Sequence, residues 1–265
     1  MLSAIRKLLR PPGPAPEARV PDGERVYAIG DIHGRSDLLE ALVEAIERDH
    51  AARGPAKSTV VLLGDLIDRG PDSFGVLLWA REWQKLRPVR ILMGNHEEML
   101  LGAMEKLDVL KQFVRFGGRE TLLSFGLDEE LYETAEWEVL HAMAIAATPQ
   151  SLLEFIRTFE DRVQIGDYLF VHAGIAPGVP IDEQKRSDLR WIREPFLSDE
   201  NWHGAMVVHG HSITGHADVR ANRIGIDTGA YASDVLTAIG LEGTERWLIE
   251  ARGTRQAVVT ETLAA

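Results

Sequence analysis

The chain has no cysteine among its 265 residues. Disulfide bridges, thiolate metal sites and cysteine nucleophiles are therefore excluded. If the protein acts on phosphate esters, it cannot do so through a phosphocysteine.

Long hydrophobic runs are also absent, since none reaches the ~18 residues that a membrane-spanning helix needs. The first ten residues are basic and amphipathic but lack the continuous apolar core of a signal peptide. Prolines at positions 11, 12, 14 and 16 follow at once and oppose regular structure. We therefore predict a cytoplasmic protein with a flexible N-terminal arm over residues 1–22 and no stable membrane insertion.

Positive charge is scarce, because 29 lysines and arginines face 41 aspartates and glutamates, for a net charge of -12. No general positive field exists to attract nucleic acid or an anionic membrane, so neither is an expected partner. The length suits one large domain with a substantial core, which we place over residues 23–265.

Three short polar loops organise the first hundred residues. They are Gly30–Gly34 (Gly-Asp-Ile-His-Gly), Gly64–Gly70 (Gly-Asp-Leu-Ile-Asp-Arg-Gly) and Gly94–Glu97 (Gly-Asn-His-Glu). Each follows a compact apolar run, and stretches with helical spacing separate the runs. Strand, loop and helix in this order predict parallel strands joined by right-handed crossovers. All three loops then emerge at one edge of a sheet, where their side chains converge.

The remaining pattern completes an α/β fold. Ser36 and Asp72 are the expected N-caps of the first two helices. Residues 105–160 are mostly helical in pattern and predict a helical cap. Residues 162–165 and 168–172 then form a hairpin around Gly166–Asp167, and the turn at Glu242–Gly243 indicates antiparallel pairing in this half. We expect two mixed sheets packed face to face as a β-sandwich, flanked by helices.

Two further histidines, His172 and His211, directly follow apolar strands, and His209 is the alternative to His211. The candidate set is Asp31, His33, Asp65, Asn95, His96, His172 and His211. Carboxylates, imidazoles and amide oxygens bind metals. Six such ligands with one shared carboxylate can hold two divalent ions, which clamp the attacking and leaving oxygens of a phosphoryl displacement. One motif alone is common by chance, but five in order at strand ends are not.

The three loop motifs resemble the signature of the phosphoprotein phosphatase family within the calcineurin-like metallophosphoesterases. The likeness runs from about residue 25 to residue 243 and implies a metallophosphoesterase β-sandwich. One departure is Met93, where eukaryotic protein phosphatases of the family usually have arginine. The segment Phe116–Gly126 instead resembles bacterial and phage members.

The resemblance also implies a role for each matching position. Asp31 and His33 look like ligands of a first metal, Asp65 like the bridging carboxylate, and Asn95, His172 and His211 like ligands of a second. His96 matches the general acid, oriented by Asp68, and Arg69 matches an arginine that grips phosphate. Arg193 is our choice for a second such arginine, with Arg190 as the alternative. Manganese is the first choice of metal, and iron, zinc or magnesium is compatible with these ligands.

The resemblance leaves more than one function open. The leading hypothesis is a serine/threonine-type phosphatase, in which a metal-bridging hydroxide attacks a phosphomonoester in line. The rival is a symmetrical bis(5'-nucleosyl)-tetraphosphatase, so the substrate is a phosphorylated protein or a small phosphoester or nucleotide. Asp68 favours the monoesterase, since the tetraphosphatase branch often has a small residue there. A non-catalytic binding module is a remote alternative, because no motif residue is lost.

Overall fold

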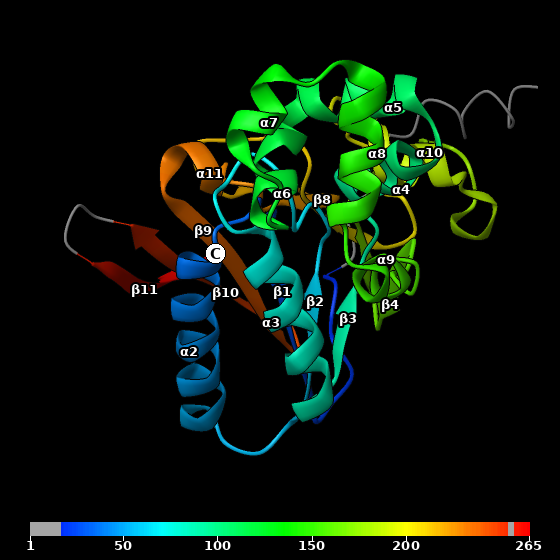
Figure 1. Ribbon diagram of the computed structural model, residues 1–265. Helices are drawn as coiled ribbons and strands as arrows, with labels where there is room; N and C mark the ends of the chain where they lie inside the picture. Colours follow the sequence, from blue (N-terminus) through cyan, green and yellow to red (C-terminus); the bar gives the residue numbers. More distant parts are fainter. Residues whose placement is uncertain (1–16, 254–256) are drawn as a thin grey trace, which may run out of the picture.

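The computed structural model describes residues 17–253 and 257–265. Their strands form two mixed sheets, with helices covering the first sheet and further helices gathered at one end of the molecule (Figure 1). The strand orders are β11-β10-β9-β1-β2-β3 and β4-β5-β6-β8-β7. This arrangement confirms the predicted α/β sandwich.

The first sheet contains the three strands that precede the loop motifs. Strands β1 (Glu24–Ile29), β2 (Lys57–Leu62) and β3 (Val89–Ile91) are parallel, as predicted. Helices α2 (Ser36–Ala52) and α3 (Ser73–Leu86) connect them, and α4 (Asn95–Glu105) follows β3. The carboxyl ends of the strands therefore deliver the three motifs to one edge of the sheet.

The two expected helix caps have different outcomes. Asp72 caps α3, where its Oδ1 accepts a hydrogen bond from the backbone N–H of Gly75 at 2.8 Å. The prediction for Ser36 was wrong, because Ser36 is already inside α2 and the N-cap residue is Arg35. The Arg35 side chain makes no capping bond and instead pairs with Asp37 and Asp234.

The C-terminal strands are divided between the two sheets. Strands β9 (Val235–Glu242) and β10 (Glu245–Gly253) are antiparallel around the predicted turn, and β9 pairs with β1 in the first sheet. Strand β11 (Val258–Ala264) was not predicted and extends the edge of this sheet.

The second sheet corrects the expectation of antiparallel pairing in this half. Strands β4 (Arg162–Ile165) and β5 (Tyr168–Val171) form the predicted hairpin, and the short β7 (Asp218–Val219) is antiparallel to β8 (Arg223–Gly225). However, β5, β6 (Met206–His209) and β8 are parallel. The segment between β5 and β6 is long enough for a crossover, which parallel strands require. It contains η2 (Ile181–Glu183) and α10 (Arg186–Trp191).

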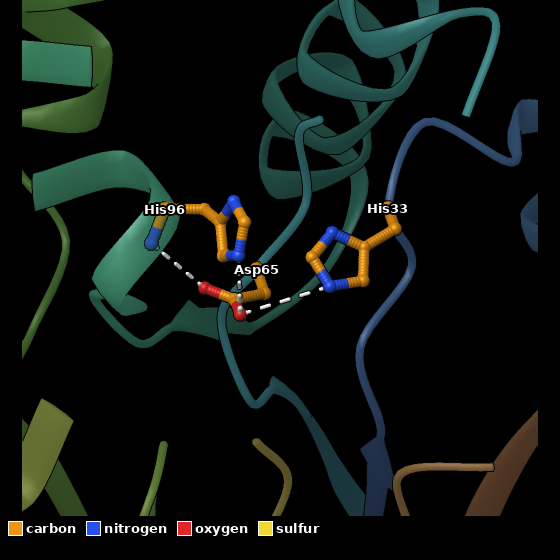
Figure 2. A group of neighbouring side chains, drawn as sticks. All are labelled: His33, Asp65 and His96. Carbon is orange, nitrogen blue, oxygen red and sulfur yellow. Dashed lines mark hydrogen bonds and ion pairs between the residues drawn. The ribbon is translucent and has the colours of Figure 1, made fainter. Parts of the chain in front are cut away.

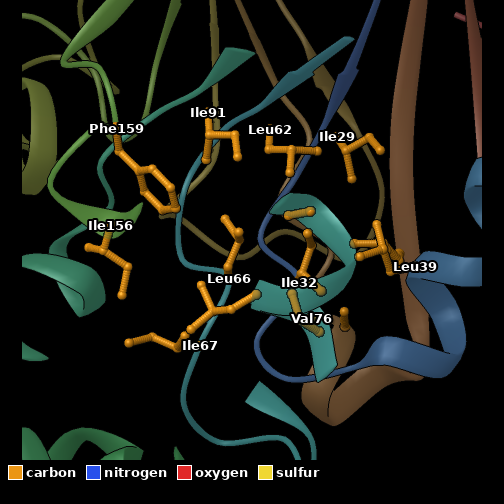
Figure 3. Close-up of a cluster of buried hydrophobic side chains, with 14 of the residues drawn as sticks. Ile29, Ile32, Leu39, Leu62, Leu66, Ile67, Val76, Ile91, Ile156 and Phe159 are labelled. Carbon is orange, nitrogen blue, oxygen red and sulfur yellow. The ribbon is translucent and has the colours of Figure 1, made fainter. Parts of the chain in front are cut away.

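Strand β1 is buried on both faces, which explains its unbroken apolar sequence. Val26 and Ala28 point into the core between the two sheets, whereas Tyr27 and Ile29 point into the core beneath the helices. Figure 3 shows part of the core beneath the helices, where Ile29 and Leu62 lie near side chains of the motif loops.

The predicted helical cap is present, and we use this name for residues 105–160. It contains α5 (Leu107–Phe113), a π-helical turn η1 (Val114–Gly118), α6 (Arg119–Ser124), α7 (Glu129–Thr134), α8 (Trp137–Ala147) and α9 (Gln150–Ile156). Ile156 and Phe159 share the core of the first sheet with Leu66 and Ile67 of the second motif loop (Figure 3). The cap is therefore packed onto the loops that carry the motifs.

The predicted N-terminal arm is described only from residue 17, and residues 1–16 lie outside the described part. Ala18 and Val20 are fully buried in the core between the sheets, and the N–H of Val20 donates to the carbonyl of Gly243 at 2.9 Å. Packed structure thus begins before the predicted boundary at residue 22, because these small apolar side chains fill space between the sheets. In the described ranges, no single helix is both long and apolar enough to cross a membrane.

Candidate metal centre and active site

The loops at the carboxyl ends of β1, β2 and β3 bring three predicted site residues together. Figure 2 shows His33, Asp65 and His96 reaching toward one another from these three segments. The Asp65 Oδ2 atom lies 3.8 Å from Nε2 of His33 and 3.8 Å from Nε2 of His96. The three residues are buried and lie close enough to hold one metal ion together.

Asp65 also belongs to a second group of possible metal ligands, with His172 after β5 and His211 after β6. Its Oδ2 lies 3.4 Å from Nε2 of His172. A single carboxylate is thus shared between two groups, as a site for two ions requires. The predicted alternative, His209, is in neither group; its Nδ1 atom faces the carbonyl of Gly210 at 3.0 Å.

Asp31 and Asn95 lie at the edge of these groups. Both Asp31 oxygens accept the backbone N–H of His211, at 3.0 and 3.2 Å, which ties the first loop to the loop after β6. The Asn95 Oδ1 atom lies 3.0 Å from Nε2 of His172. All six predicted metal ligands therefore converge. His96, which was predicted as the general acid, also lies within reach of the first metal group.

The site backbone is held in an unusual conformation. Among the described non-glycine residues, those with positive φ are His33, Asp65, Asp68, Arg69, His211 and Asp234. All except Asp234 are predicted site residues, and such strain concentrates at functional sites. Two glycines leave no room for a side chain, because a Cβ on Gly94 would lie 2.2 Å from Asp65 Oδ1 and one on Gly210, just before His211, would lie 2.0 Å from Asp31 Oδ1.

The protonation of the site suits divalent cations. The Nδ1 atoms of His33 and His172 face the carbonyls of Ile67 at 2.7 Å and Leu63 at 2.8 Å, which leaves each Nε2 atom on the side of Asp65. Burial lowers the pKa of His33 and of His211 to about 3, so both imidazoles are neutral, as metal ligands must be.

The carboxylates of the site are buried close together, so their ionised forms need nearby positive charge. Burial, together with the nearby Asp227 and Asp65, raises the pKa of Asp31 well above its usual value. Burial also acts against ionised Asp65, but His172 and His96 outweigh it and hold the Asp65 pKa well below normal. Bound cations would stabilise both carboxylates in the ionised form. The residues present therefore fit a metal centre.

A histidine–aspartate pair lies beside this centre. His96 Nδ1 and Asp68 Oδ2 are 2.5 Å apart, and both side chains are buried. Although burial alone would favour neutral imidazole, Asp65 and Asp68 raise the pKa of His96. The pair can therefore hold a proton on a histidine that faces the metal groups.

Two of the three arginines considered in the sequence analysis lie at the metal groups. Arg69 points its Nη1 atom at His33 Nε2, 2.7 Å away, and its Nη2 atom at His96 Nε2, 3.0 Å away. Arg193 donates to the carbonyl of His211 at 3.1 Å, so it also borders the centre. Arg190, the alternative, is bound to Asp161 and Glu98 and is committed to ion pairs.

Sequence reasoning gave no role to Glu97, although it quoted the residue within a motif. Glu97 is fully buried, and its two oxygens accept the backbone N–H groups of Asp65, Leu66, Ile67 and Gly94 at 2.7 to 3.3 Å. A carboxylate three residues into the third loop thus holds the second loop. Tyr231 was also missed; it lies in the short helix α11 (Ala230–Ser233), which has no recognisable motif, and its ring lies 4.9 Å from the Arg69 guanidinium carbon.

We expect Glu97→Gln to destabilise the fold by about 3 kcal/mol, because an amide NH₂ would then face backbone N–H donors that have no other acceptor nearby. Urea unfolding of the metal-free protein measures this. Glu98→Gln is the matched control, since the Glu98 side chain is partly exposed and, within the described residues, its oxygens bond to Arg190 and Trp191 alone; it should cost less than about 1 kcal/mol. Equal effects of the two changes would contradict the role given to Glu97.

Imidazoles grouped around a shared carboxylate, with a proton donor at hand, suit a metal-dependent hydrolase, and this is the class that fold and site define. Within it, the chain belongs to the calcineurin-like phosphoesterase family, whose model matches residues 24–236.

Individual relatives point to two activities. The chain is 32% identical to serine/threonine-protein phosphatase 1 of Salmonella typhimurium, over 80% of this chain and 89% of that protein. It is 24% identical to a symmetrical bis(5'-nucleosyl)-tetraphosphatase of Nitrosospira multiformis, over 82% of this chain and 92% of that protein. A crystal structure of a provisionally assigned diadenosine tetraphosphatase has a TM-score of 0.60 at 19% identity, over 91% of this chain and 94% of that one, which establishes the fold.

Proposed function

We propose that the protein is a serine/threonine-type phosphatase that hydrolyses phosphomonoesters. The observation that carries this proposal is the 2.5 Å contact of His96 with Asp68, beside the carboxylate of Asp65. An alkoxide leaving group is strongly basic and needs a proton as it departs, and a histidine oriented by a carboxylate can supply one. A nucleotide leaving from an anhydride needs less protonation, so the buried pair favours the monoesterase.

In this proposal the chain binds two divalent metal ions. Asp31 and His33 serve the first ion, Asp65 serves both, and the second is held by Asn95, His172 and His211. When bound, such ions polarise the phosphate oxygens and lower the pKa of water. Manganese is our first choice, and Asn95 with two carboxylates and three imidazoles also suits iron, zinc or magnesium.

The side chains around the metals then have separate tasks. Arg69 and Arg193 bind phosphate oxygens, for which the planar guanidinium is suited. In the doubly protonated form of His96, Asp68 keeps the proton on Nδ1 and orients the ring, and the second proton, on Nε2, goes to the leaving oxygen once Arg69 has turned from Nε2 to the phosphate. The buried position of His96 excludes bulk water from this proton.

A second candidate function, symmetrical hydrolysis of dinucleoside tetraphosphates, is favoured by the likeness to the Nitrosospira multiformis enzyme over most of both chains. Turnover of a phosphoserine peptide, an aryl phosphate and diadenosine tetraphosphate by the same manganese-loaded preparation separates the two. We expect kcat/KM to be highest for the peptide. A preference for diadenosine tetraphosphate would reject our assignment in favour of the second candidate.

Arg69 and a metal ion must compete for His33 in this scheme. The Nε2 atom of His33 has one lone pair, which faces Arg69 Nη1 at 2.7 Å, so Arg69 has to release it when the metal binds. We therefore expect Arg69→Ala to bind manganese at least as tightly as the wild type, by titration calorimetry. Its inhibition by inorganic phosphate should weaken about tenfold, because a charged hydrogen bond is lost.

Arg190→Ala is the matched control for this change. Arg190 makes ion pairs with Asp161 and Glu98, whereas the guanidinium that faces His33 is that of Arg69. Both manganese affinity and phosphate inhibition should stay as in the wild type. Weaker manganese binding by Arg69→Ala than by this control would show that Arg69 supports the metal site instead of competing with it.

A further inference from the structure

A short segment of the cap, Gly117–Thr121, makes hydrogen bonds to the second motif loop, Gly64–Gly70. The N–H of Arg69 donates to the carbonyl of Gly117 at 2.9 Å. Gly117 has φ of 108°, and a Cβ there would lie 2.6 Å from Cγ of Arg69. Four residues later, at the start of α6, the fully buried Thr121 reaches the neighbouring residue, Asp68.

The contact between Thr121 and Asp68 is a double one. The Thr121 hydroxyl donates to Asp68 Oδ1 at 2.5 Å, and its oxygen accepts the backbone N–H of Asp68 at 2.9 Å. Ser73, at the start of α3, lies 2.8 Å from the same hydroxyl oxygen and also accepts the N–H of Asp68, at 3.0 Å. All these groups are buried, so water cannot substitute for any of them.

With Asp68 ionised, the donors and acceptors in this cluster allow one arrangement. Asp68 Oδ2 is occupied by His96 Nδ1, so the carboxylate uses one oxygen for the histidine and the other for Thr121. The single hydroxyl proton of Thr121 goes to the carboxylate, and the Ser73 hydroxyl therefore donates to Thr121. The Thr121 hydroxyl thus fixes Oδ1 of Asp68, while His96 holds Oδ2.

We propose that Thr121 is a positioning residue for the reaction: its hydroxyl, supplied by the cap, orients the Asp68 carboxylate that orients His96. The inference rests on the proposed role of His96 as general acid. It makes the cap part of the proton-delivery machinery, in addition to any contact with substrate. The covalent steps are unchanged, since Thr121 neither gains nor loses a proton.

The test compares Thr121→Val with Thr121→Ser. Valine has the shape of threonine without the hydroxyl, whereas serine keeps the hydroxyl. We expect Thr121→Val to lower kcat about tenfold for a phosphoserine peptide, the scale of one lost hydrogen bond to a charged group. The loss for nitrophenyl phosphate should be less than about twofold, because that leaving group departs without a proton. Thr121→Ser should restore the peptide rate.

Thr148→Val is the matched control. Thr148 is also a buried cap threonine, but it is the C-cap residue of α8, and its hydroxyl donates to the carbonyl of Ala144 in that helix at 2.7 Å. It should leave the ratio of peptide to nitrophenyl rates unchanged. In addition, Thr121→Val should have no further effect on that ratio in an Asp68→Asn background, since Thr121 acts through Asp68.

The outcomes separate the inference from the function on which it rests. If His96→Asn selectively slows the peptide reaction but Thr121→Val slows both substrates equally, the hydroxyl only stabilises the fold and our inference is wrong. If His96→Asn itself shows no selectivity, the proposed acid fails, and the inference fails with it. A ratio that drops with valine, recovers with serine and does not change with Thr148→Val supports the inference.

Discussion

Replacing Asp65 with asparagine is expected to release both metal ions and to abolish turnover. Asp65 is the one residue shared by the two buried groups of possible ligands, and its Oδ2 faces His33 on one side and His172 on the other. Asparagine keeps the shape but removes the charge that two cations share. Loss of an outer-shell partner alone costs about 10–100-fold in metal affinity, so loss of this ligand should exceed 100-fold.

The measurement is elemental analysis after manganese loading and desalting, beside a direct titration. The wild type should approach two ions per chain. Asp68→Asn is the matched control, because it is the same chemical change at a buried carboxylate of the same loop that lies outside both groups. It should keep its metals. Two tightly held ions in Asp65→Asn would reject the assignment of the bridging carboxylate.

His96→Asn should slow phosphoserine-peptide hydrolysis by about 10²–10⁴-fold, the usual contribution of general acid catalysis. Nitrophenyl phosphate should be affected much less, since nitrophenolate is stable without a proton. The dependence of kcat on leaving-group pKa is therefore expected to steepen in the variant. Asp68→Asn should show the same trend more weakly, because a misoriented histidine still carries a proton.

Metal content has to be measured in each variant, since His96 Nε2 lies only 3.8 Å from Asp65 Oδ2. His141→Asn is a suitable control: His141 is a cap histidine whose Nε2 faces the carbonyl of Ala103, and it belongs to neither group of possible metal ligands. It should leave the leaving-group dependence as in the wild type. If the dependence of kcat on leaving-group pKa is no steeper for His96→Asn with full metal content than for this control, the proton comes from another group.

Much of the centre could be predicted from the sequence because its parts are local. Each of the first three motifs directly follows a strand, and parallel strands bring the residues after their carboxyl ends to one edge of a sheet. His33, Asp65 and His96 converge for this reason alone (Figure 2). The sandwich was predictable on similar grounds, since runs such as Val60–Leu63 are apolar without a break and have to be covered on both faces.

Other features depend on contacts between distant segments, which no local pattern encodes. Thr121 is 53 residues from Asp68 in the sequence, and the two are in contact only because the cap folds back onto the second motif loop. Arg190 and Arg193 look alike in the sequence, but Asp161 and Glu98 happen to lie beside the first.

The sequence by itself therefore determined which residue types stand at the strand ends, and with them the metal chemistry and the class of reaction. Tertiary structure alone decided the orientation of the groups that serve this chemistry: the left-handed backbone of Asp65 and Asp68, the hold of Glu97 on the second loop, and the hydroxyl of Thr121 against Asp68. The physical reason is that strand-end placement follows from local hydrophobic pattern, whereas side-chain orientation follows from packing between segments that the pattern does not connect.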